Sequence, residues 1–270
     1  MRTHRTIAEL EAALEPVRVG SEVGLVPTMG ALHGGHRALV ERAQDECDVV
    51  VASIFVNPAQ FAPSEDLERY PRDEEHDALL AEEWSVDYLF VPPTEEMYPH
   101  GFQTWVEVGE LADLLEGAAR PGHFRGVATV CLKLFNIVRP RRAYFGQKDA
   151  QQAAVVEQMV RDLALPLQIR LVPTVRDEDG LAVSSRNAYL TAEEREAARA
   201  LPRALAAGLE AHRHGGLAAG AARTVLAGER RLDPEYVEVA RLDGRTYLLA
   251  AVRAGRARLI DNVVLEGEIA

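Results

Sequence analysis

Cysteine is scarce in this sequence. Of 270 residues only Cys47 and Cys131 are cysteines, and each lies in an apolar context. Small folds held by disulfides need several paired cysteines at short spacing. The sequence therefore predicts a fold held by its hydrophobic core, in a compartment that keeps thiols reduced.

Long hydrophobic runs and an excess of positive charge are also missing. No uninterrupted apolar stretch approaches the roughly 20 residues that span a bilayer, and the start of the chain leads into an acidic amphipathic segment. Lysine and arginine number 30 against 42 aspartates and glutamates, for a net charge of -12. Nucleic acids require a basic surface. We therefore expect a cytoplasmic protein without a nucleic-acid or membrane partner.

Apolar runs that are typical of buried parallel strands alternate with amphipathic segments over the first two thirds of the chain. A capping box of Thr6 and Glu9 predicts a first helix to about Leu14. The predicted strands are 23–26, 48–56, 88–91, 143–145 and 167–172, and the predicted helices are 37–47, 73–84, 124–138 and 149–163. This alternation predicts an α/β fold with a Rossmann-like, doubly wound parallel sheet.

The pattern changes near residue 174. A turn cluster occupies 177–180, and Thr191 with Glu194 forms a capping box that predicts one long alanine-rich helix. A second helix near 217–229 and strands at 236–242, 246–252 and 257–264 follow. We therefore predict a domain of residues 1–174 and a smaller C-terminal α+β domain of residues 175–270.

The segment Pro27-Thr28-Met29-Gly30-Ala31-Leu32-His33-Gly34-Gly35-His36 joins a predicted strand to a predicted helix. A helix start offers free N–H groups and the positive end of its dipole, which suits a phosphate. The two histidines can donate hydrogen bonds to phosphate oxygens. Two other interpretations remain open, namely a zinc pair, which would need further ligands, and ordinary surface histidines.

Neutral amides follow the second predicted strand. Asn57 and Gln60 lie in the segment 55–61, and ligands of open α/β sheets bind beyond the carboxyl ends of strands. Both amides suit the hydroxyl and carboxylate groups of a small substrate. An Asn-Pro turn without a ligand is the competing interpretation.

Two further segments carry cations or hydroxyls suited to phosphate. Lys148 follows another predicted strand, although a lysine there is more often simply solvated. Ser184, Ser185 and Arg186 lie in a connection that we expect to be mobile. The acidic run 73–77 is typical of a negatively charged first helical turn, and 120–127 of a loop entering a helix.

Six motifs, taken in order, resemble those of the pantoate–β-alanine ligases, or pantothenate synthetases, of the HxGH nucleotidylyltransferase superfamily. They are PTMGALHGGH, FVNPAQF, RYPRD, RPGHFRGV, YFGQKDAQQ and VSSRN. The resemblance implies that the pantoate carboxylate attacks the α-phosphorus of ATP and releases pyrophosphate. The amine of β-alanine then attacks the pantoyl adenylate, giving pantothenate and AMP. Alternatives are an adenylyltransferase for another cofactor precursor and an inactive nucleotide-binding protein.

The resemblance also implies the site residues. Those assigned to ATP are Met29, Gly30, Ala31, Leu32, His33, Gly34, Gly35, His36, Gly146, Gln147, Lys148, Asp149, Val175, Val183, Ser184, Ser185 and Arg186. Those assigned to catalysis are His36 as proton donor, with His33, Lys148 and Arg186. Those assigned to pantoate or β-alanine are Gln60, Gln152 and Asn57.

Several family properties follow as expectations. Mg²⁺ accompanies ATP, although no protein ligand for the metal can be assigned. A homodimer is expected, and the C-terminal domain is expected to act as a lid. Two positions depart from the pattern of many relatives, which carry a larger acidic residue in place of Gly34 and, in some cases, an acid in place of His76.

Overall fold

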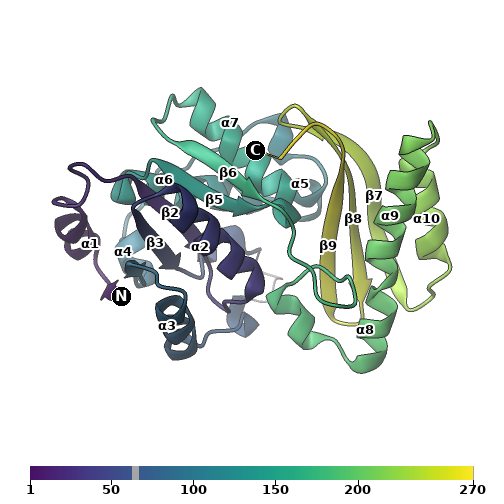
Figure 1. The fold of residues 1–270 in the computed structure, drawn as a ribbon, viewed down its shortest axis with the longest axis horizontal. Coiled ribbons are helices and arrows are strands. Elements are labelled where there is room, and N and C mark those ends of the chain that lie inside the picture. Colours follow the sequence, from purple (N-terminus) through teal and green to yellow (C-terminus); the bar gives the residue numbers. More distant parts are fainter. Residues whose placement is uncertain (63–66, 270) are drawn as a thin grey trace. The chain divides into compact units, whose positions relative to one another are not determined.

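The computed structural model describes residues 1–62 and 67–269, which form two compact units (Figure 1). The first unit comprises Met1–Phe145 and Gln151–Val172. The second comprises Gly146–Ala150 and Pro173–Ala270. The short segment Gly146–Ala150, which we expected within the first domain, thus groups with the C-terminal part of the chain.

The first unit contains a six-stranded sheet with the order β1-β4-β3-β2-β5-β6. Its strands are β1 (Arg2–His4), β2 (Val23–Thr28), β3 (Val49–Ile54), β4 (Tyr88–Phe90), β5 (Arg142–Gly146) and β6 (Gln168–Val172). The pairs β2·β3, β2·β5, β3·β4 and β1·β4 are all parallel. The doubly wound prediction is confirmed. The strand order reverses between β2 and β5, and ligands of such sheets bind beyond the carboxyl ends of strands at this point.

The five predicted strands are present, but β1 was not predicted. It pairs with β4 through the register His4↔Phe90 and adds a strand at the edge of the sheet. Its three residues are polar or charged, so they show no apolar pattern from which a strand can be recognised.

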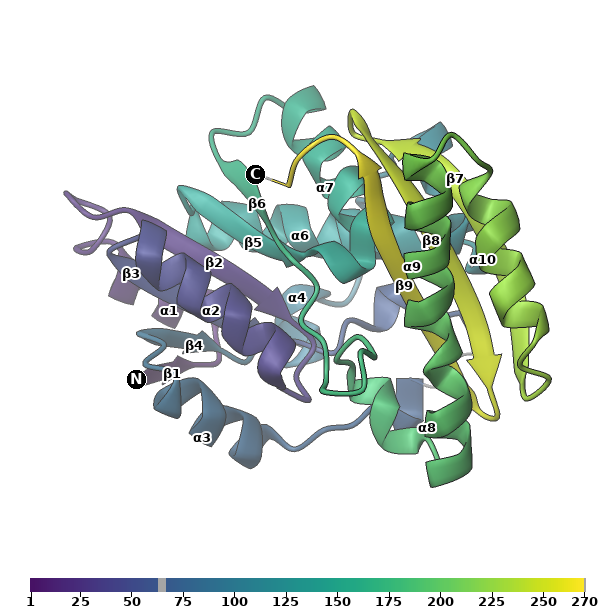
Figure 2. The ribbon, with the colours of Figure 1, turned by 45° about the vertical axis from the view of Figure 1, so that its right-hand side comes forward.

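Helices surround this sheet (Figures 1 and 2). They are α1 (Ile7–Leu14), α2 (Gly34–Glu46), α3 (Glu74–Glu83), α4 (Thr94–Met97), α5 (Glu116–Ala119), α6 (His123–Val138) and α7 (Ala150–Asp162). The capping box of Thr6 and Glu9 at α1 is confirmed. Leu39 and Ala43 of α2 are buried in one cluster with Val50 and Ala52 of β3, which fixes α2 on the sheet. Exposing the larger of these side chains, Leu39 or Val50, to water would cost about 1.5–3 kcal/mol each.

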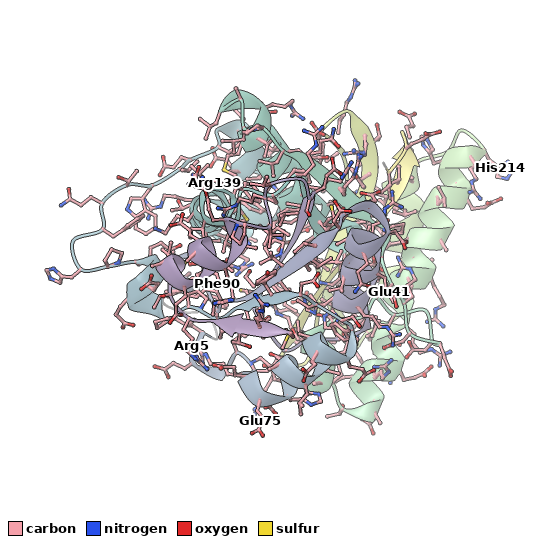
Figure 3. All side chains as sticks on the ribbon, turned by 60° about the vertical axis from the view of Figure 1, so that its left-hand side comes forward. Arg5, Glu41, Glu75, Phe90, Arg139 and His214 are labelled. Atoms are coloured by element: carbon pink, nitrogen blue, oxygen red, sulfur yellow. The ribbon has the colours of Figure 1, made fainter. Side chains whose placement is uncertain are left out.

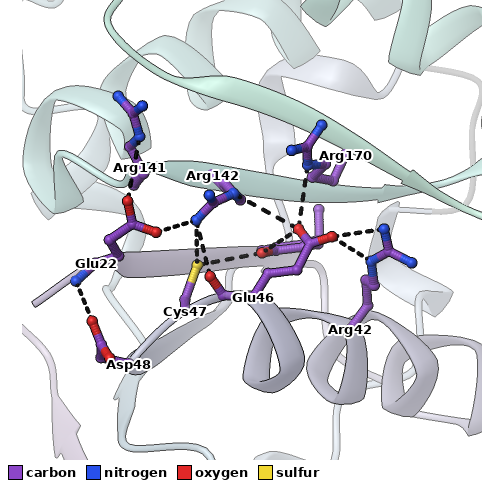
Figure 4. A network of polar contacts seen from close by, with 9 residues as sticks. Glu22, Arg42, Glu46, Cys47, Asp48, Arg141, Arg142 and Arg170 are labelled. Atoms are coloured by element: carbon purple, nitrogen blue, oxygen red, sulfur yellow. Dashed lines mark hydrogen bonds and ion pairs between the residues drawn. The ribbon is translucent and has the colours of Figure 1, made fainter. Parts of the chain in front are cut away.

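A polar network ties the end of α2 to β5 and β6 (Figure 4). The hydroxyl of Tyr144 and Nε of Arg170 both donate to Oε2 of Glu46, over 3.1 and 3.2 Å. Burial raises the pKa of Glu46, but hydrogen bonds from Arg42 and Tyr144 outweigh this effect and hold the pKa below its ordinary value. The ionised carboxylate therefore anchors the helix whose other end carries the two histidines.

The second unit is an α+β structure. Its antiparallel sheet has the order β7-β8-β9, formed by β7 (Leu232–Leu242), β8 (Arg245–Ala254) and β9 (Ala257–Glu266). Two helices, α9 (Ala200–Arg213) and α10 (Ala218–Ala227), cover one face of this sheet (Figure 2). Leu201 and Leu226 of these helices share a core with Leu248 and Val252 of β8. The predicted order of helices before strands is confirmed.

The prediction of one long alanine-rich helix from Thr191 is wrong. The capping box of Thr191 and Glu194 is present, but α8 (Ala192–Ala198) ends at Arg199 and α9 begins at Ala200. Pro202 explains the break, because proline has no N–H and its ring collides with the carbonyl of the residue four positions earlier, here Ala198. Among all helices described, none is long and apolar enough to cross a membrane.

Candidate active site

The two histidines of the PTMGALHGGH segment cap helix α2 with their own rings. Nδ1 of His33 accepts the N–H of Gly35 over 3.1 Å, and Nδ1 of His36 accepts the N–H of His33 over 3.3 Å. The rings stack with centroids 4.1 Å apart and an interplanar angle of 28°. Since both Nδ1 atoms accept, each neutral ring carries its proton on Nε2. Each imidazole is therefore a hydrogen-bond donor at Nε2.

This geometry limits which donors at the start of α2 could bind a phosphate. We expected the start of α2 to offer its backbone N–H groups, but those of His33 and Gly35 donate to the imidazoles. The N–H of His36 donates to the carbonyl of His33 over 2.8 Å. The imidazole Nε2–H groups are further donors suited to an anion at this point, assisted by the helix dipole.

The acidic run 73–77 begins α3 as predicted. Asp73 is the N-cap and accepts the N–H of His76 over 3.0 Å. Asp77 has a second role that the sequence pattern did not indicate. Its buried carboxylate accepts the N–H groups of Ala31 and Leu32, over 2.8 and 2.7 Å. The run thus supports the loop that precedes the histidines.

The side chain of Asn57, in the FVNPAQF segment, makes four hydrogen bonds. Its Nδ2 donates to Oε1 of Gln60 (3.0 Å) and to the carbonyl of Gly126 (3.1 Å). Its Oδ1 accepts the N–H of Ala59 (3.2 Å) and the hydroxyl of Tyr98 (2.9 Å). Burial raises the pKa of Tyr98, so this hydroxyl keeps the proton that it donates. All four hydrogen-bonding positions of the Asn57 amide are used, and a substrate could bind it only by replacing one of these partners.

Gln60 joins this segment to residues 27–36, which we call the histidine loop. It is 6% exposed, and its Nε2 donates to Sδ of Met29 over 3.0 Å. A thioether is a weak acceptor. A substrate hydroxyl would be a better acceptor than this sulfur. A substrate carboxylate would be better still, because charge-assisted hydrogen bonds are about twice as strong as neutral ones. The Gln60 amide is therefore suited to exchange sulfur for a polar ligand.

The RPGHFRGV segment holds the backbone of Gln60. Nδ1 of His123 donates to the carbonyl of Gln60 over 2.9 Å, and Nε2 of the same ring accepts from Arg120 over 3.1 Å. A Cβ on Gly126 would lie 2.3 Å from the carbonyl oxygen of Ala59, so only glycine lets α6 approach this closely. The segment that we expected to be a loop entering a helix is thus also a support for Gln60.

Lys148 lies in the second unit, on a segment fixed by β9. Nδ2 of Asn262 donates to the carbonyls of Gln147 (2.8 Å) and Lys148 (3.0 Å), and Nε2 of Gln147 donates to Oδ1 of Asn262 (3.1 Å). Nζ of Lys148 lies 3.6 Å from the carboxylate of Asp149. The amide pair is buried. The sequence does not indicate this role of Asn262, because nothing in its neighbours distinguishes it from other strand residues.

The connection before α8 forms a hairpin in the second unit. The N–H of Val183 donates to the carbonyl of Val175 over 3.0 Å. Arg176 makes two hydrogen bonds, of 2.7 and 3.1 Å, to the fully buried carboxylate of Asp261. Ser184 caps the following turn η5 (Ser185–Tyr189) by accepting the N–H of Arg186 over 3.3 Å. The predicted mobility of this connection stays a prediction, but its backbone has defined partners.

The predicted site residues thus form local groups within each unit. The first unit brings together Met29, Gln60 and Asn57 and stacks His33 on His36, while Gln152 is half-buried on α7. The second unit fixes the segments of Lys148 and of Val175 to Arg186. Within residues 1–62 and 67–269, no group of three or more His, Cys, Asp or Glu side chains could hold a metal ion.

Comparisons with known proteins agree with these motifs. Residues 2–264 match the family model described as Pantoate-beta-alanine ligase. The chain is 54% identical over 282 aligned residues to pantothenate synthetase of Chloroflexus aurantiacus, covering 99% of both chains. It is similar to the crystal structure of pantothenate synthetase from Thermus thermophilus, with a TM-score of 0.94, 50% identity and coverage of 99% and 100%.

A third relative was solved with ligands. It is the pantoate-beta-alanine ligase of Francisella tularensis, complexed with beta-gamma ATP and β-alanine, with a TM-score of 0.83, 34% identity and full coverage of both chains. The family model and these relatives extend over nearly the whole sequence. The chain therefore belongs to the pantoate–β-alanine ligase family.

Proposed function

We propose that this protein joins pantoate to β-alanine through a pantoyl adenylate, with ATP as co-substrate. The single observation that carries this proposal is the contact between Gln60 and Met29, which unites the amide segment with the histidine loop in one unit. A nucleotide-binding loop beside neutral amides suits a reaction between ATP and a small hydroxy acid. Family membership does not favour the alternative of an adenylyltransferase for another cofactor precursor.

In the first step the pantoate carboxylate attacks the α-phosphorus, and the bond from this phosphorus to pyrophosphate breaks. Negative charge grows on the phosphate oxygens, so fixed donors lower the barrier. We propose that Nε2–H of His36 and of His33 supplies such hydrogen-bond donors, and that His36, the predicted proton donor, acts on the growing charge through this hydrogen bond while keeping its proton. Lys148 and Arg186 are proposed to contact the phosphates as cations. The other residues predicted to bind ATP remain proposals of the same kind.

In the second step the amine of β-alanine attacks the carbonyl carbon of the mixed anhydride, and AMP leaves. The carboxyl group is already activated, so no nucleophile from the protein is required. The protein's contribution is to orient the two reactants and exclude water, since hydrolysis would waste the adenylate. The prediction that the second unit acts as a lid stays a prediction.

The substrates are proposed to be held by amides. Gln60 can exchange its sulfur acceptor for a substrate oxygen, and Gln152 is proposed to contact pantoate. Asn57 remains a proposed substrate residue, but its four hydrogen bonds favour a role in orienting Gln60.

Mg²⁺ is proposed to accompany ATP. Asp77 is the buried acid that supports the histidine loop, and both its carboxylate oxygens already accept backbone N–H groups. We therefore propose that phosphate oxygens and water, rather than this carboxylate, provide the metal's ligands. The cytoplasmic location and the homodimer are likewise proposals, which cell fractionation and sedimentation would test.

Product analysis tests the proposed function. Pantothenate, AMP and pyrophosphate should form together when ATP, Mg²⁺, D-pantoate and β-alanine are all present, and no pantothenate should form when any substrate is left out. Formation of ADP and inorganic phosphate would rule out the adenylate route.

Replacing Gln60 by alanine is expected to raise the KM for pantoate about tenfold or more. The change removes one hydrogen bond to a charged substrate, which is worth about 1.5–3 kcal/mol. Steady-state kinetics with varied pantoate measure the effect, and thermal unfolding checks that the variant is folded. The exposed Gln103 replaced by alanine is the matched control. An unchanged KM for pantoate would return FVNPAQF to its interpretation as a turn.

A further inference from the structure

Two consecutive residues of the histidine loop have left-handed backbone conformations. Gly30 has φ of +82° and Ala31 has φ of +51°. Glycine adopts this region readily, but an alanine there brings its Cβ close to a carbonyl oxygen, which is unfavourable. Ala31 must therefore be held in this conformation by contacts with the rest of the protein.

Asp77 supplies these contacts from α3. One carboxylate oxygen accepts the N–H of Ala31 and the other accepts the N–H of Leu32, so the carboxylate bridges two successive peptide groups. Asp77 is only 2% exposed. A Cβ on Gly30 would lie 2.8 Å from its Oδ2, so the loop and the carboxylate are in close contact.

The requirement here is for a carboxylate. An ionised aspartate presents only acceptors, whereas an asparagine of the same shape presents one acceptor and one donor. In an asparagine variant one of the two loop N–H groups would face an NH₂ group. The position of Asp77 in the first turn of α3 also favours negative charge, because the helix dipole is positive there.

We propose that Asp77 is a positioning residue for the proposed adenylate-forming step, acting through the histidine loop. It fixes the left-handed turn at Gly30 and Ala31. This turn places Met29 in contact with Gln60 and positions His33 as the N-cap of α2. Asp77 itself touches no substrate. This inference rests on the proposed function of the loop in ATP binding.

The test compares Asp77→Asn with Glu75→Gln. Both remove one negative charge from the first turn of α3, but Glu75 projects outward from the protein (Figure 3). In pantoate-dependent exchange of pyrophosphate into ATP, Asp77→Asn is expected to lower kcat/KM for ATP about tenfold to a hundredfold, while Glu75→Gln leaves it unchanged. A folded Asp77→Asn variant with normal exchange activity would overturn the proposal.

A second variant separates positioning of the turn from general damage. Ala31→Gly lowers the cost of the left-handed conformation, so in the Asp77→Asn background it is expected to restore exchange activity about fivefold. The activity of Ala31→Gly alone is the reference against which this rescue is measured, so any direct effect of the loop change is accounted for. Loss of packing around α3 would not be repaired by a glycine in the loop, so failure of this rescue would contradict the assigned role.

Hydrogen exchange and a loop variant test the same contact between Asp77 and the loop. Amide hydrogen exchange at Ala31 and Leu32 should accelerate in Asp77→Asn and not in Glu75→Gln, and equal protection in both would contradict the proposal. This readout needs no catalysis, so it distinguishes failure of the inference from failure of the proposed function. If Asp77→Asn does not fold, Gly30→Ala disturbs the same contact from the loop, and normal activity of that variant would overturn the assignment.

Discussion

Replacing His36 by alanine is expected to lower kcat about 10²- to 10³-fold, the effect of losing one preorganised donor to developing charge. The KM for ATP should change far less, because the donor acts mainly on charge that appears in the transition state. The structure supports this expectation because Nδ1 of His36 accepts the N–H of His33, which leaves the proton on Nε2. Single-turnover formation of the adenylate measures the step directly.

Two substitutions separate the donor role of His36 from its capping role. His36→Asn retains an acceptor near the position of Nδ1 but has no donor at Nε2, so it should be as slow as the alanine variant. His36→Gln can place an N–H near Nε2 and should recover part of the activity. If the alanine variant were folded and its kcat unchanged, the assignment of His36 as the donor to the growing charge would be wrong.

Replacing Lys148 or Arg186 by alanine should lower the rate of the first step about tenfold to a hundredfold, since each cation is proposed to bond to charged phosphate oxygens. Isotope exchange between pyrophosphate and ATP, with pantoate and without β-alanine, reports this step alone. The KM for pantoate should move little, which contrasts with the expected behaviour of Gln60→Ala.

The control for these variants is Arg213→Ala. Arg213 belongs to α9 of the same unit, and its side chain is 65% exposed. It tests whether loss of any positive charge from this unit slows the reaction. Normal exchange in both Lys148→Ala and Arg186→Ala would show that neither cation serves the phosphates.

Much of the fold could be predicted because its signals are local. Buried parallel strands appear as apolar runs, and the capping boxes of Thr6 and Thr191 mark where α1 and α8 begin. The break at Arg199 was also encoded locally, by Pro202, but the alanine-rich pattern concealed it. The strand β1 could not be recognised, because its three polar residues become a strand only by pairing with β4.

The site residues likewise differ in whether their roles depend on local or on distant parts of the sequence. The histidine pair and the amides were visible because they lie in compact motifs at strand ends. Asp77 and Asn262 were not, since each acts on a segment far along the chain, 46 residues away in the contact of Asp77 with Ala31 and 115 in that of Asn262 with Gln147. The use of the imidazoles as helix caps was likewise hidden, because it depends on ring orientation.

The central claim is that pantoate is activated as an acyl adenylate, and the fate of its carboxylate oxygens tests this most directly. Pantoate labelled with heavy oxygen in the carboxylate is converted with ATP and β-alanine, and the products are analysed by mass spectrometry. When the amine displaces AMP, the bond between the carbonyl carbon and the bridging oxygen breaks. The account predicts that one labelled oxygen appears in the phosphoryl group of AMP. Label in inorganic phosphate, or AMP without label, would contradict it.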